Sequence, residues 1–88
     1  MDNLDNSLVD AHRMVNWFAL GEAKRLAEKI SSTVRSYRKN KNEPMAQKAL
    51  TDVAKESVIF LRQRAIPEAM QAAQAVQSVL DSFEETKA

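Results

Sequence analysis

The sequence predicts an all-α protein that folds as a single helical domain over residues 1–88. The chain contains one glycine and two prolines, and no stretch shows the apolar–polar alternation of a half-buried strand. Apolar residues instead recur at steps of three and four over long segments, which is typical of helices with one apolar stripe. We therefore expect a long helical hairpin or a three-helix bundle.

The first helix is predicted over residues 6–38. Asp5 or Ser7 can accept hydrogen bonds from the free amides of its first turn. Apolar side chains from Leu8 to Tyr37 then follow one stripe. Gly21 is the weak point, because a glycine inside a helix costs about 1 kcal/mol relative to alanine. We expect a slight bend at Gly21 or the close approach of another backbone, and the sequence leaves open whether the helix continues through it.

A basic turn is predicted over residues 38–44, and the helices lead into it and away from it. The segment holds three cations, two asparagines, a proline and no aliphatic side chain. Proline cannot continue a preceding helix, so this composition indicates a solvated connection. Asn42 is the expected N-cap of the next helix, with Pro44 in its first turn.

The second helix is predicted over residues 44–65 and ends before Pro67, whose ring breaks or kinks a helix. Its residues 58–61 are four consecutive apolar side chains. Four such residues cover every direction around a helix, so no single neighbouring helix can bury them all. They either lie between two helices of the same chain or contact another subunit.

The third helix is predicted over residues 67–84, with Pro67 as its start. Apolar residues from Ala69 to Phe83 recur as in a heptad seam, and Met70 extends it. The glutamines beside this seam form an uncharged flank. Such a flank indicates partial burial, and we expect it to belong to an interface.

The core available to one chain is thin, and this favours a homo-oligomer. Only five residues are aromatic, and a chain of this length buries only ~60–65% of its unfolded surface. Trp17 is a candidate interface anchor, because tryptophan often serves that purpose. The residues predicted to form the interface are Trp17, Val58, Ile59, Phe60, Leu61, Met70, Val76, Leu80 and Phe83.

Charge is unevenly distributed along the chain, although the total is only +1. Residues 24–64 carry eleven lysines and arginines against four acidic residues, a net charge of +7, whereas residues 1–23 and 65–88 each carry −3. In a helical hairpin the cations around the turn converge at its tip, where they could contact phosphate or an acidic partner surface. The alternative is an ordinary solvated turn. The residues of this predicted anion or partner site are Arg35, Tyr37, Arg38, Lys39, Lys41 and Lys48.

Catalytic and metal sites are not expected. The chain has no cysteine and one histidine, His12, whose nearest acidic neighbour Asp10 points to a different helix face. A glycine-rich phosphate loop and a Glu-x-x-His pair are both missing. We therefore predict no enzyme activity, no metal and no cofactor, and take His12 as a surface or capping residue.

The expected location is the cytoplasm, with no membrane association. The first residues are acidic and polar, unlike the cationic start of a signal peptide. No apolar run approaches the ~18 residues that a membrane span needs.

These observations predict a non-enzymatic interaction module, a small regulator, adaptor or inhibitor that oligomerises and docks on another macromolecule by shape and charge. A second hypothesis is a helical oligomer that binds anionic nucleotides or nucleic acid through its basic turn. In that case Tyr37 could stack on a base, beside Arg35, Arg38 and Lys39.

Overall fold

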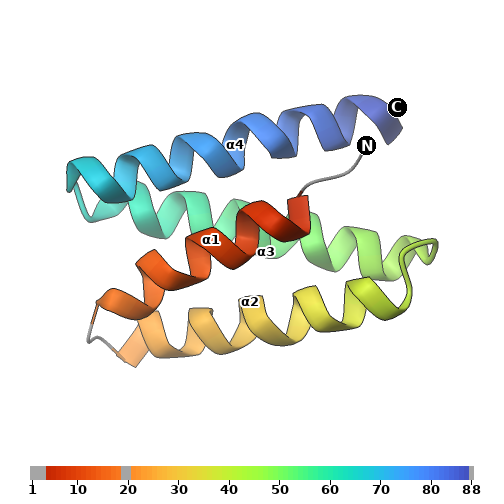
Figure 1. Cartoon of the computed structure of the whole chain (residues 1–88), viewed down its shortest axis with the longest axis horizontal. Coiled ribbons are helices and arrows are strands. Elements are labelled where there is room, and N and C mark those ends of the chain that lie inside the picture. The colour runs from red at the N-terminus through yellow and green to blue at the C-terminus, as the bar shows by residue number, and fades with distance from the viewer. Residues whose placement is uncertain (1–3, 19–20, 88) are drawn as a thin grey trace.

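The computed structural model describes residues 4–18 and 21–87, with side chains to residue 85. In this part of the chain there are four helices, α1 (Leu4–Trp17), α2 (Gly21–Lys39), α3 (Pro44–Gln63) and α4 (Pro67–Lys87), and no strand. Each helix runs antiparallel to the one before it, so the chain forms an up-and-down helical bundle (Figure 1). The α2–α3 connection lies at one end of the bundle together with the N-terminus of α1 and the C-terminus of α4.

The predicted single helix over residues 6–38 is wrong, because α1 ends at Trp17 and α2 begins at Gly21. The bundle therefore has four helices rather than the two or three expected. A helix over residues 6–38 would be about 50 Å long, whereas the longest dimension of the bundle is 34 Å. The excess length would carry apolar residues with no helix beside them. Folding back buries both halves of the stripe against the same core.

Gly21 starts α2 instead of bending a continuous helix, and the expected close approach of another backbone is also wrong. A Cβ atom added to Gly21 would meet nothing within 4 Å. Residues 19 and 20 lie outside the described part of the chain.

The other helix boundaries follow the two prolines, as predicted. Pro44 and Pro67 are the first residues of α3 and α4, where the missing amide proton of proline costs no hydrogen bond. The N-cap of α3 is Glu43 rather than Asn42, and its side chain makes no capping hydrogen bond. Between α3 and α4, Ala65 adopts a left-handed backbone conformation with φ of 55°.

All four helices contribute to one hydrophobic core. α1 packs against each of the other helices, whereas the backbones of α2 and α4 lie diagonally apart and the Tyr37 ring of α2 reaches Phe83 of α4 across the core. Fully buried side chains include Leu8 of α1, Ile30 of α2, Leu61 of α3 and Leu80 of α4. In Figure 1, α1 lies between α2 and α4.

Among the described residues, three ion pairs connect neighbouring helices, namely Arg38–Asp5, Lys29–Glu56 and Lys55–Glu84. In the last two, both side chains are about half exposed. Such pairs contribute about 0–1 kcal/mol each, so burial of the apolar core provides most of the stability.

Candidate functional site

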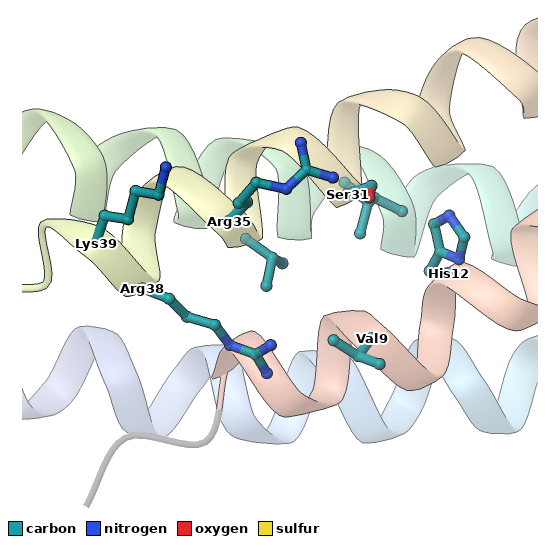
Figure 2. Close-up of a pocket in the computed structure, with 8 residues that line it drawn as sticks. Val9, His12, Ser31, Arg35, Arg38 and Lys39 are labelled. Carbon is teal, nitrogen blue, oxygen red and sulfur yellow. The ribbon is translucent and has the colours of Figure 1, made fainter.

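A groove of about 440 Å³ lies between α1 and α2, near the end of the bundle that carries the α2–α3 connection. We call it the basic groove. Its floor is apolar and formed by Val9, Ile30 and Val34. Its rim is polar and mostly cationic, and consists of His12, Ser31, Arg35, Arg38 and Lys39. Figure 2 shows α1 supplying Val9 and His12 while α2 supplies the other labelled residues.

Helical spacing explains why these residues meet. Ser31, Arg35 and Arg38 are four and three residues apart, so they lie along one flank of α2. Val9 and His12 lie three residues apart on α1 and occupy the flank that faces it. The groove is therefore a consequence of packing two antiparallel helices whose adjoining flanks are small or flexible.

Arg38 joins the two helices across the end of the groove. Its Nε donates to Asp5 Oδ2 at 2.8 Å, and its Nη2 donates to Asn6 Oδ1 at 3.0 Å. The Asp5 side chain is only 11% exposed, so this charged hydrogen bond is shielded from water on one side. Figure 2 shows Arg38 reaching toward the first turn of α1. Much of the charge of Arg38 is thus neutralised inside the protein.

Arg35 and Lys39 are exposed and belong to no ion pair within the described part of the chain. They are the two cations of the groove that remain available for an external anion. Figure 2 shows the Arg35 side chain lying along α2 in the direction of Ser31.

Tyr37 lies in the core and not at the surface. It is 5% exposed, and its ring packs edge-on against Phe83 of α4 with 6.4 Å between centroids. Tyr37 follows the apolar stripe of α2 at three residues from Val34, which explains its burial. It therefore cannot stack on a nucleic-acid base in this fold.

Lys41 and Lys48 lie outside the basic groove. Lys41 is exposed in the α2–α3 connection, where its carbonyl accepts a hydrogen bond from Gln47 Nε2 at 2.8 Å. Lys48 pairs with Asp52 one turn along α3 at 3.1 Å. Of the six residues predicted for the anion or partner site, the structure brings together Arg35, Arg38 and Lys39.

Sequence reasoning missed Val9 and Ser31 and treated His12 as a residue with no role at a site. His12 is half-buried in the groove beside α2. Its spacing from Val9 was visible in the sequence. That signal could not identify the groove, because the reversal after Trp17 was not predicted.

Most of the residues predicted to form an oligomer interface are buried inside this chain. Six of them are at most 8% exposed, and they are Val58, Phe60, Leu61, Val76, Leu80 and Phe83. The other three, Trp17, Ile59 and Met70, are 71%, 58% and 52% exposed. The apolar run at residues 58–61 thus lies mainly between helices of one chain, with Ile59 directed outward.

Among the described residues, no group of three His, Cys, Asp or Glu side chains is arranged to hold a metal ion. No helix in the same part of the chain combines the length and the apolar character needed to cross a bilayer. Comparison with known proteins found no matching family model, no similar curated protein and no similar solved structure.

Proposed function

We propose that this protein is a non-enzymatic interaction module, a small regulator, adaptor or inhibitor that self-associates and docks on an acidic segment of a partner protein. The observation that carries the docking proposal is the basic groove, in which an apolar floor lies beside two cations, Arg35 and Lys39, that have no partner in the described structure. An amphipathic helix rich in Asp and Glu fits such a surface, with its apolar face on Val9 and its carboxylates toward α2.

The same groove supports nucleic acid less well. Binding of single strands usually combines cations with aromatic side chains on which bases stack. Tyr37 is buried, Arg38 is held by Asp5 and Asn6, and the residues that line the groove include no Phe, Tyr or Trp. Two of the four groups assigned to nucleotide binding are therefore used inside the protein.

The surrounding charge favours an anionic partner in general. Residues 24–64 carry a net charge of +7, and a concentrated positive field accelerates association with acidic surfaces. The apolar floor favours a protein partner over a polynucleotide, because a protein can bury aliphatic side chains against it. A cytoplasmic location is part of the same proposal, and imaging of a tagged chain in its host tests it.

The test is a titration with a fluorescently labelled acidic amphipathic peptide, and in parallel with labelled single-stranded DNA and with ATP, at low and at physiological salt. We expect the peptide to bind and its affinity to fall as salt rises. The double variant Arg35→Glu/Lys39→Glu should lose this binding. Lys24→Glu/Arg25→Glu is the matched control, because it makes the same change of charge on α2 with the centres of the two pairs about 19 Å apart along the helix.

Two outcomes would contradict the proposal. Equal loss of binding in both double variants would show that total charge, and not the groove, attracts the peptide. Binding of DNA or ATP without binding of the peptide would favour the second hypothesis, a helical oligomer that takes nucleotides or nucleic acid.

A further inference from the structure

The outer face of α4 lacks charge over most of its length. Between Glu68 and Asp81 the helix contains twelve residues, and none of them is charged. The exposed residues in this stretch are Met70, Gln71, Gln74, Ala75 and Ser78. Surfaces that stay in water are usually rich in Lys, Glu and Asp, whereas the centres of protein interfaces are depleted in them.

A second groove, also of about 440 Å³, borders this face between α1 and α4. Its apolar lining includes Met14, Ile66 and Ala72, which are partly buried and pack against the core. Its rim carries charges of both signs, Arg13 with Asp10 and Glu68. None of these three charged residues belongs to an ion pair in the described part of the chain.

Trp17 also lines this groove and is 71% exposed. Its ring packs edge-on against Phe18 at 5.1 Å between centroids, and Phe18 packs against Phe60 at 5.9 Å. These aromatic contacts connect the exposed indole to the core. An exposed tryptophan beside a groove is the kind of residue that dominates binding energy at interfaces.

We propose that the α1–α4 groove, Trp17 and the charge-free face of α4 together form a two-fold interface with a second copy of this chain. In a two-fold interface the same patch occurs on both subunits, so it must carry both members of every complementary pair. This patch does so. It offers a projecting indole and an apolar groove, and an unpaired Arg13 together with an unpaired Glu68. Each Trp17 enters the groove of the other subunit, and each Arg13 faces the other subunit's acidic rim.

The charges argue against a membrane surface as the occupant. Anionic lipid headgroups attract clustered Lys and Arg, whereas residues 65–88, which include α4, carry a net charge of −3. The basic groove is also unsuited to self-association, because its two available charges have the same sign. The proposal rests on the self-association part of the proposed function, and it is independent of docking to an acidic partner.

The test is the mass of the full chain in solution, by sedimentation equilibrium from low to high micromolar concentration. We expect a dimer that Trp17→Ala weakens by about 30-fold or more. Ile59→Ala is the matched control, since Ile59 is also an exposed apolar residue, 58% exposed, and lies between α2 and α3 instead. It should leave the dimer unchanged.

Charge exchange then tests the identity of the occupant. Arg13→Glu and Glu68→Arg should each weaken the dimer, and the double variant Arg13→Glu/Glu68→Arg should restore most of it, because the pair between positions 13 and 68 is then re-formed with reversed sign. Helical content measured by circular dichroism separates these effects from unfolding. A wild-type chain that stays monomeric, or a dimer that survives Trp17→Ala, would overturn the proposal. The titration with the acidic peptide would remain valid in either case, so the two failures are distinguishable.

Discussion

α2 and α4 are similar inside the bundle and different outside it. They have 19 and 21 residues and each presents a stripe of buried apolar side chains to the core. The outer face of α2 carries lysines, arginines and glutamates over residues 22–29 and cations again over residues 35–39, whereas α4 has no charge from residue 69 to residue 80. The inner face of a helix indicates how the helix packs in the core, and the outer face indicates what the helix contacts at the surface. This contrast is the reason for proposing that the outer face of α2 is exposed to water and anions and that the outer face of α4 contacts protein.

The largest expected effect tests the similarity of the inner faces. Ile30→Ala in α2 and Leu80→Ala in α4 should each lower the free energy of unfolding by about 2–5 kcal/mol, because each creates a cavity at a side chain that is at most 1% exposed. Urea denaturation measures the change. Val9→Ala, at a residue 37% exposed, is the control and should cost far less. If either core variant were tolerated, the two helices would not share one core.

The next effect tests the difference between the outer faces. Ala75→Lys places a charge on the charge-free face of α4 and should weaken the dimer by about tenfold or more, because a lysine must lose its hydration there. Ser32→Lys makes an equivalent addition to the exposed face of α2 and should leave the dimer unchanged.

Both lysine variants should keep the stability of the monomer, measured in a Trp17→Ala background, within about 0.5 kcal/mol. Sedimentation and urea denaturation provide the two measurements. Equal dimer affinity in the two variants would remove the distinction between the faces.

A smaller effect concerns the ion pair that fixes α2 to α1. Asp5→Ala should lower the free energy of unfolding by about 1 kcal/mol, because it removes a charged hydrogen bond to a side chain that is only 11% exposed. The loss stays this small because Arg38 is 47% exposed and keeps access to water. High salt should reduce the difference.

The control for this pair is Asp52→Ala. It removes an exposed pair within α3 and should change stability by less than about 0.5 kcal/mol. A comparable loss in both variants would mean that the burial of Asp5 has no energetic importance.

The smallest effects concern the residues that lead into the two helices. α2 begins with Gly21, whose φ is not positive and whose surroundings have room for a Cβ, and α4 follows Ala65, which has φ of 55°. Gly21→Ala should therefore stabilise the fold by about 0.5–1 kcal/mol. Ala65→Gly should stabilise it by about 1 kcal/mol, since a side chain is disfavoured in the left-handed region.

Thermal melting tests both substitutions, and each should raise the midpoint. Ala75→Gly is the control at an exposed position inside α4. It should lower the midpoint, because glycine in a helix interior costs about 1 kcal/mol relative to alanine. A fall in the midpoint with Ala65→Gly would mean that the left-handed conformation is not retained in solution.

The prediction of the fold was accurate where local chemistry decides and wrong where distant segments compete. Pro44 and Pro67 mark helix starts by their own covalent structure, so α3 and α4 were located closely. The reversal after Trp17 has no proline before it, and apolar residues continue at helical spacing on both sides. Only the 34 Å length of the bundle shows that one long helix could not bury that stripe.

The candidate site shows the same division. The concentration of charge in residues 24–64 was evident and directed attention to the end of α2, beside which the basic groove lies. Which cations remain available was not evident, because Arg38 is paired with Asp5, 33 residues away. Tyr37 was predicted both on the apolar stripe and among the cations of the turn, and in the structure its position on the stripe decides that it is buried.

The sequence by itself determined that the chain is helical, where α3 and α4 begin, and which face of each helix is apolar. These properties depend on groups within a few residues of one another, through proline geometry and the 3.6-residue period. The tertiary structure alone decided that α1 and α2 are separate helices, that Arg35 and Lys39 lie beside an apolar floor, and that Trp17 projects beside a groove. Those outcomes depend on burying the apolar surface of four helices at once, and no local segment contains that information.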